Sequence, residues 1–113
     1  MAKRIVPNSA RHEHGKVHLS LNRGLTTVVD EADYPLVSSY HWTALLSKTG
    51  RCWYVRTNVT VNGRQYTFIM HRLLMGLTPA DRRWVDHRDH DGLNNTRENI
   101  RFANFSENAR NRR

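Results

Sequence analysis

The sequence predicts an α+β fold, in which β-hairpins in the N-terminal part precede a strand–loop–strand–helix unit at the C-terminus. Three observations predict this class. The length of 113 residues fits one compact domain. The Asn62-Gly63 dipeptide divides a long β-prone run into two halves, as a hairpin turn does. Residues 84–113 then combine two short apolar runs, a long polar loop and a polar terminal segment.

Residues 1–16 are polar and basic, with Pro7 and Gly15, and are predicted to form a basic flexible arm. No apolar stretch follows the first basic residues, so a secretory signal is not expected and we place the protein inside a cell. Charged residues interrupt every apolar stretch of the chain, so no membrane segment is expected.

Residues 17–83 are predicted to form a β-rich N-terminal portion. Within Val17–Val29, two β-prone runs are separated by Asn22, Arg23 and Gly24, which predicts a first hairpin.

The segment 30–42 is ambiguous, because it lacks a clear period. Asp33 could cap a short helix that has Pro35 in its first turn. Tyr40 and Trp42 would then be core aromatic residues, and we expect Trp53 and Trp84 to lie in the core as well.

The strongest signal for secondary structure lies in Cys52–Met70. A two-residue turn at Asn62-Gly63 pairs Val61 with Arg64, Val59 with Tyr66, Thr57 with Phe68 and Val55 with Met70. One predicted face, the apolar one, then carries Trp53, Val55, Val59, Tyr66, Phe68 and Met70. The other carries Tyr54, Arg56, Asn58, Gln65 and Thr67, which is either a solvated sheet face or a surface that touches a nucleic-acid backbone.

A short helix is predicted near residues 69–76, where apolar residues have helical spacing and Gly76 is a suitable terminator. Residues 77–83 are expected to form a loop around Pro79. In the segment 84–113, VDH and IRFA are predicted strands that flank the loop RDHDGLNNTREN, and a terminal helix starts near Ser106.

The composition favours a polyanionic partner. The net charge is +8, and fifteen of the eighteen basic residues are arginine, whose planar guanidinium matches phosphate oxygens. A solvated basic surface or an anionic lipid surface would have the same composition. The single cysteine, Cys52, excludes an internal disulfide and a four-thiolate cluster, so no structural zinc is expected.

Asp86 and His87 are the best candidates for chemistry. Hydrolysis of a phosphodiester needs a base that activates water and a cation that neutralises charge on the phosphate. A carboxylate is a hard metal ligand, and an imidazole titrates near neutrality. Neighbouring side chains on a strand point to opposite faces, so the pair can serve one site only where the strand ends or is irregular.

The stretch VDHRDHDGLNNTRENIRFANFSENARNRR resembles the ββα-metal motif of HNH endonucleases, particularly the phage and intron-encoded homing branch. With His87 as the first letter of the motif, Asn99 lies twelve positions further on and Asn108 nine beyond that. The preceding MHRLLMG also resembles the segment that leads into the motif, and a weaker likeness extends back to about Leu19.

The resemblance implies a role for each of these residues. His87 would be the general base, Asp86 and Asn108 would hold one divalent metal ion, and Asn99 would bridge the loop and orient His87. Asn108 stands where the family usually has a final histidine. A carboxylate and an amide oxygen favour Mg²⁺ or Mn²⁺ over Zn²⁺.

Further residues are expected to support the site or bind DNA. His71 is either a buttress of the site or an ordinary partly buried residue, and Asn95 is expected to fix the loop through side-chain hydrogen bonds. The arginines near the motif would contact phosphates and make binding sensitive to salt. They are Arg88, Arg97, Arg101, Arg110, Arg112 and Arg113.

The resemblance implies metal-dependent hydrolysis of double-stranded DNA. One site per chain would nick one strand as a monomer, and double-strand cleavage would need a homodimer or two successive nicks, so the oligomeric state stays open. The alternatives are a non-catalytic DNA-binding protein with a degenerate fold, and a ribonuclease. The residues do not indicate the target sequence or choose between homing, packaging, restriction and exclusion.

Overall fold

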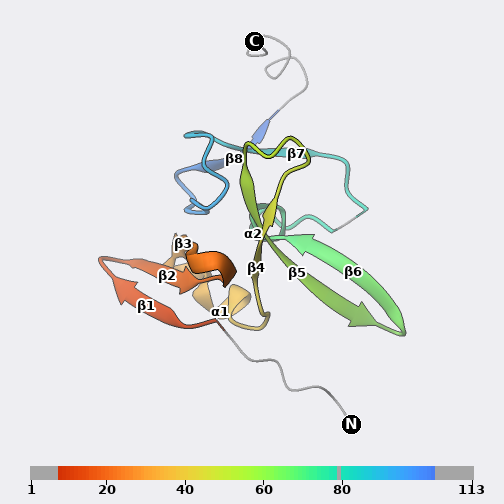
Figure 1. The fold of residues 1–113 in the computed structure, drawn as a ribbon, viewed down its shortest axis with the longest axis horizontal. Helices are drawn as coiled ribbons and strands as arrows, with labels where there is room; N and C mark the ends of the chain where they lie inside the picture. The colour runs from red at the N-terminus through yellow and green to blue at the C-terminus, as the bar shows by residue number, and fades with distance from the viewer. Residues whose placement is uncertain (1–7, 79, 104–113) are drawn as a thin grey trace.

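The computed structural model describes residues 8–78 and 80–103, which form three small antiparallel sheets and two short α-helices (Figure 1). The first sheet contains β1 (Ala10–Glu13), β2 (Lys16–Ser20) and β3 (Thr26–Asp30). The second contains β4 (Thr43–Leu46), β5 (Trp53–Val61) and β6 (Arg64–Ile69), and the third contains β7 (Trp84–His87) and β8 (Ile100–Ala103). The helices are α1 (Tyr34–Val37) and α2 (Met70–Leu74), and short 3-10 turns occupy Asn22–Gly24 and Glu31–Asp33.

The first predicted hairpin is confirmed, since β2 pairs with β3 with Val17 opposite Val29. The structure differs from the predicted arm over residues 10–16, where β1 adds a third strand. His14 and Gly15 both have positive φ and make the tight turn between β1 and β2. All four residues of β1 are exposed, so this strand is held by backbone pairing and has no apolar alternation that could have predicted it.

The segment 30–42, which the sequence left ambiguous, contains a short helix. This helix, α1, follows Asp33 and has Pro35 in its first turn. The Asp33 side chain makes no capping hydrogen bond and binds Arg97 instead. Trp42 is buried as predicted, and its indole Nε1 donates to the carbonyl of Val37 at 2.8 Å.

The predicted register of the β5–β6 hairpin is confirmed from Val61–Arg64 to Thr57–Phe68. The ladder ends one pair later, at Arg56–Ile69, because α2 begins at Met70. The predicted pairing of Val55 with Met70 is therefore wrong, although both side chains are buried in the core. The predicted apolar face is buried only near the base of the hairpin, since Val61 is 48% exposed and Tyr66 is also exposed.

One hydrophobic core joins the three sheets and both helices. Its buried members are Val17, Leu19, Val29, Val37, Trp42, Val55, Met70, Leu74 and Ile100. The predicted short helix is confirmed as α2, which buries Met70, His71 and Leu74 and is followed by Gly76 at φ +79°. Trp84 is 59% exposed, so its expected place in the core is wrong: it lies on the face of β7 opposite to that of buried His87 and partly buried Val85.

The described part of the C-terminal unit has the predicted strand–loop–strand form. β7 and β8 pair antiparallel, with His87 opposite Ile100, and residues 88–99 form the loop between them. The predicted terminal helix, including Ser106, Asn108, Arg110, Arg112 and Arg113, lies outside the described residues. Among the described residues, no helix combines the length and the apolar character that a bilayer span requires.

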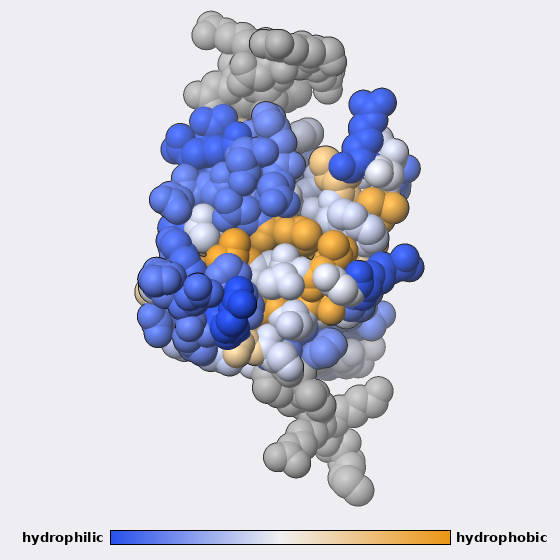
Figure 2. All heavy atoms as spheres, turned by 60° about the vertical axis from the view of Figure 1, so that its left-hand side comes forward, coloured by the Kyte–Doolittle hydropathy of each residue, from blue (hydrophilic) through white to orange (hydrophobic). Residues whose placement is uncertain are grey.

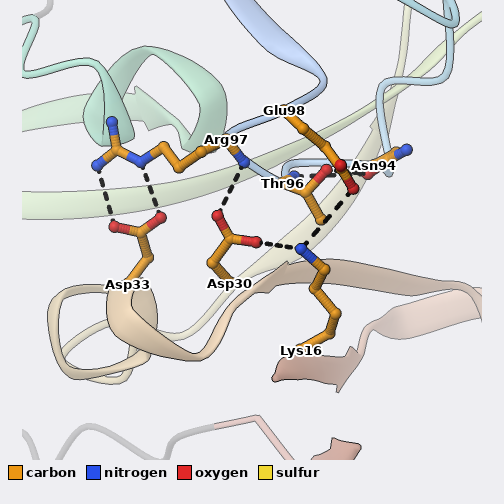
Figure 3. A network of polar contacts seen from close by, with 7 residues as sticks. All are labelled: Lys16, Asp30, Asp33, Asn94, Thr96, Arg97 and Glu98. Carbon is orange, nitrogen blue, oxygen red and sulfur yellow. Dashed lines mark hydrogen bonds and ion pairs between the residues drawn. The ribbon is translucent and has the colours of Figure 1, made fainter. Parts of the chain in front are cut away.

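The 88–99 loop is tied to the first sheet by a network of polar contacts (Figure 3). Asp30 accepts hydrogen bonds from Lys16 Nζ at 2.7 Å and from the backbone N of Arg97 at 3.1 Å. The Arg97 guanidinium binds Asp33 through two bonds of 2.8 and 3.0 Å. The loop therefore has a fixed position relative to the N-terminal strands.

Hydrophilic side chains dominate one side of the molecule, and a narrower hydrophobic band crosses it (Figure 2).

Gly92 brings the loop against the second sheet. A Cβ at this position would lie 1.9 Å from the backbone carbonyl oxygen of Trp53 and 3.2 Å from the Tyr54 ring. We expect Gly92→Ala to displace the loop and to lower the free energy of unfolding by about 1–3 kcal/mol, measured by urea denaturation. Gly50→Asn is the control, because a Cβ there meets nothing within 4 Å and asparagine tolerates positive φ. Equal stability of the two variants would contradict the close approach.

Candidate active site

His87 is the last residue of β7, and its side chain is only 5% exposed. Strand alternation puts it on the inner face beside Ile100, whereas Asp86 lies on the opposite face beside Arg101. Asp86 turns back at the strand end, where its Oδ1 accepts a hydrogen bond from the backbone N of His87 at 2.9 Å. The two side chains therefore flank the start of the 88–99 loop.

Asn95 makes the hydrogen bond that fixes the His87 ring. Asn95 is 1% exposed, and its Oδ1 lies 2.9 Å from His87 Nε2. The amide nitrogen of Asn95 donates to Thr27 Oγ1 at 2.9 Å and to the carbonyl of Gly92 at 3.3 Å, so Oδ1 must be the atom that faces His87. His87 Nε2–H then donates to Asn95, and the lone pair of the neutral ring is on Nδ1.

Thr27 extends this contact into the first sheet. Its hydroxyl donates to the carbonyl of Leu93 at 2.8 Å and therefore accepts, through a lone pair, the hydrogen bond from Asn95. Thr27 is fully buried on β3. The chain from Thr27 through Asn95 to His87 links residues that are far apart in the sequence.

Asn99 bridges the 88–99 loop, as the resemblance implied, and its part in orienting His87 stays a prediction. Its Oδ1 accepts from the backbone N of Asp89 at 3.1 Å, and its Nδ2 donates to Asp89 Oδ1 at 2.9 Å and to the carbonyl of Asn94 at 2.8 Å. Asn99 thus bridges two parts of the loop, while the contact with His87 comes from Asn95.

His71 and Tyr54 complete the surroundings of His87. The ring centroids of His71 and His87 are 4.6 Å apart, and Tyr54 stacks on His71 at 6.0 Å. Burial, reinforced by His87 and Arg72, lowers the pKa of His71 to about 3, so this ring is neutral at physiological pH. Burial, with smaller contributions from Cys52 and Asp86, raises the pKa of Tyr54. His71 is buried and lies against His87, and its support of the site stays a prediction.

The predicted DNA-binding arginines differ in their surroundings. Arg88 is exposed at the start of the loop. The Arg101 Nη2 lies 3.8 Å from Asp86 Oδ2, and its buried Nε has no hydrogen-bond partner among the described residues. The guanidinium of Arg97 is held by Asp33, so its role in the structure is to anchor the loop.

Asp86 is the predicted metal ligand that lies within the described residues. Its Oδ1 is used by the backbone of His87, and its Oδ2 has only the long contact with Arg101. Within residues 8–78 and 80–103, no three His, Cys, Asp or Glu side chains gather as a metal cluster. The second predicted ligand, Asn108, lies outside the described residues.

The inference from sequence missed Thr27 and Tyr54. Neither stands in the motif, and nothing in the local sequence distinguishes Thr27 from other strand threonines. Tyr54 was assigned to the correct face of the hairpin, but the approach of α2 and of the 88–99 loop to that face is a tertiary feature.

Comparison with known proteins supports a relationship to HNH endonucleases. The chain is 33% identical over 94 residues to an uncharacterised HNH endonuclease of Acanthamoeba polyphaga mimivirus. The match covers 83% of this chain and 47% of that protein, so the chain spans about half the length of the curated relative. No family model matches the chain. No solved structure matches it either.

The neutral state of His71 predicts a pH dependence of stability. The folded protein does not protonate His71 until about pH 3, whereas the unfolded chain does so near 6.5. Unfolding therefore takes up a proton between these values, and stability falls as the pH drops from about 6.5 towards 3, by up to about 1.4 kcal/mol per pH unit. We expect His71→Phe, which keeps an aromatic ring beside Tyr54, to flatten this slope between pH 6.5 and 5 in urea denaturation.

The matched control for this measurement is His14→Phe, because the side chain of His14 is 89% exposed. An unchanged slope in His71→Phe would show that His71 is not the group that takes up the proton.

Proposed function

We propose that this chain is a metal-dependent endonuclease that hydrolyses phosphodiester bonds in double-stranded DNA, with His87 as the general base. The observation that carries the proposal is the 2.9 Å contact between His87 Nε2 and Asn95 Oδ1, from which we infer that Nε2 carries the hydrogen and Nδ1 the lone pair. The similarity to a protein named as an HNH endonuclease supports the same reaction class.

In this proposal His87 Nδ1 takes the proton of the attacking water. Asn95 accepts the Nε2–H and so stabilises the ring in the orientation that presents Nδ1, and also stabilises the imidazolium that forms. His71 is neutral and close to His87, so it packs against the base without adding a positive charge beside it.

Asp86 and Asn108 would hold one divalent cation, for which Mg²⁺ or Mn²⁺ is the best match to oxygen ligands. The fit is supported by Asp86 Oδ2, which has no hydrogen-bond partner closer than the 3.8 Å contact with Arg101. A Mg²⁺ site commonly uses one or two carboxylates together with water and substrate phosphate. The cation would supply charge neutralisation at the scissile phosphate.

The charge of +8 supports a nucleic acid as the substrate. The Arg101 Nη2 lies 3.8 Å from Asp86 Oδ2, so this cation is close enough to the proposed metal site to contact the same phosphate. One site per chain predicts that a monomer nicks one strand.

We expect His87→Ala to lower the rate of plasmid nicking by about 10²- to 10⁴-fold, the usual loss when a general base is removed. Asp86→Ala is expected to abolish nicking at low metal concentration. Neither variant removes an arginine, so both should keep salt-sensitive binding to duplex DNA, measured by fluorescence anisotropy. The activity assay is the conversion of supercoiled plasmid with Mg²⁺ or Mn²⁺.

His14→Ala is the matched control for His87→Ala, because it removes an exposed imidazole on the turn between β1 and β2. Persistent supercoils with excess wild-type protein would favour a non-catalytic DNA-binding protein. Faster cleavage of RNA than of duplex DNA at the same salt would favour a ribonuclease.

The chain of hydrogen bonds from Thr27 through Asn95 to His87 predicts that a residue of the first sheet affects catalysis. Thr27→Val removes the hydroxyl that orients Asn95, and we expect the cleavage rate at saturating DNA to fall by about three- to tenfold. Thr27→Ser keeps the hydroxyl and should retain most of the activity. The nitrogen NMR shifts of His87 report its tautomer directly. If wild type, Thr27→Val and Thr27→Ser had the same His87 tautomer and the same cleavage rate, the predicted effect of Thr27 on His87 would be contradicted.

A further inference from the structure

One face of the β5–β6 hairpin starts at the candidate active site and continues to the hairpin tip. The register places Tyr54, Arg56, Asn58 and Thr60 on this face, together with Gln65 and Thr67 of β6. Tyr54 stacks on His71, and its ring centroid lies 6.5 Å from that of His87. A ligand bound along this face would therefore extend to the neighbourhood of His87.

The outer half of this face is open and polar. We call Asn58, Thr60, Gln65 and Thr67 the distal polar face; all four are exposed. Figure 1 shows the hairpin extending away from the rest of the described molecule. Thr67 Oγ1 donates to Asn58 Oδ1 across the strands at 2.8 Å, which fixes the amide and turns its NH₂ group outward. Asn58 is thus a pre-organised hydrogen-bond donor.

Arg56 is the charged residue on this face of the hairpin. Residues 34–80 contain no aspartate or glutamate, and the register places Arg64 on the opposite face. Arg56 lies between Tyr54 and the distal polar face, and its buried Nε has no hydrogen-bond partner among the described residues. A guanidinium group on a strand pair without carboxylates is complementary to a phosphate backbone.

We propose that the distal polar face reads base edges in the major groove of the DNA that is cut, and that Arg56 binds the backbone between this contact and the scissile phosphate. The proposal rests on the proposed function for the position of the cut. The major groove is about 12 Å wide and admits a two-stranded ribbon. Amide and hydroxyl side chains are the groups that recognise bases there.

The length of the hairpin sets the distance between recognition and cleavage. Strands rise about 3.3 Å per residue, so Asn58 lies roughly 13 Å and Thr60, opposite Gln65, roughly 20 Å from Tyr54. With about 3.4 Å per base pair, the bases recognised lie roughly four to six base pairs from the cut.

The test is cleavage of a randomised duplex library by the full chain, followed by sequencing of the cut ends. We expect Asn58→Ala and Gln65→Ala to lower the base preference at roughly four to six base pairs from the cut by about fivefold, the loss of one hydrogen bond. Tyr66→Phe and Val61→Ala, on the opposite face and each one ladder pair nearer to the tip than Asn58 and Gln65 respectively, should keep the preference.

Unchanged preferences in both alanine variants, or equal losses in the two controls, would overturn the inference while the endonuclease activity stands. If wild type binds the library without cutting it, selection of bound duplexes replaces end sequencing. A loss of selectivity in Asn58→Ala or Gln65→Ala then supports base recognition by the distal polar face. In that case the proposed endonuclease function is contradicted and the inference about recognition is not. Binding without any base selection, or a preference for single-stranded RNA, also overturns the inference.

Discussion

The hydrogen bond between His87 and Asn95 is the contact on which the arrangement of the candidate site depends. Both side chains are buried, so each polar atom must find a partner inside the protein. The Asn95 amide satisfies His87 on one side and Thr27 on the other, and this arrangement exists only when the 88–99 loop lies against β3. The contact that orients His87 therefore forms only when the loop is in its folded position.

The charged network on the outside of the 88–99 loop also fixes the position of the loop. Asp30 and Asp33 hold the backbone and the guanidinium of Arg97, and the attachment of Lys16 to Asp30 joins β2 to the same cluster. These ion pairs are partly exposed, so each contributes little by itself and screening by salt weakens it. Their effect on the site is positional, because they fix the loop at the residue that follows Asn95 and Thr96.

The positions of the acidic residues decide which cations of the described chain are held in ion pairs. The carboxylates of the described residues lie before position 34 and after position 80, and there they pair with Lys16, Arg83 and Arg97. The second sheet lies between these regions and has no carboxylate of its own. Arg56 and Arg64 of this sheet consequently form no ion pair with a carboxylate of the described residues.

The sequence by itself determined the local elements. The Asn62-Gly63 turn predicted the register of β5 and β6, the helical spacing before Gly76 predicted α2, and Asp86 and His87 were placed at the end of a strand that pairs with Ile100 and its neighbours. Turn geometry and strand alternation act over a few residues, so they can be inferred from adjacent positions. The choice of Asn95 instead of Asn99 as the partner of His87, the part played by Thr27 and Tyr54, and the use of Arg97 as an anchor were decided only by the tertiary structure. Each depends on two segments distant in the chain that come together to bury polar groups, and no local pattern specifies which groups will meet.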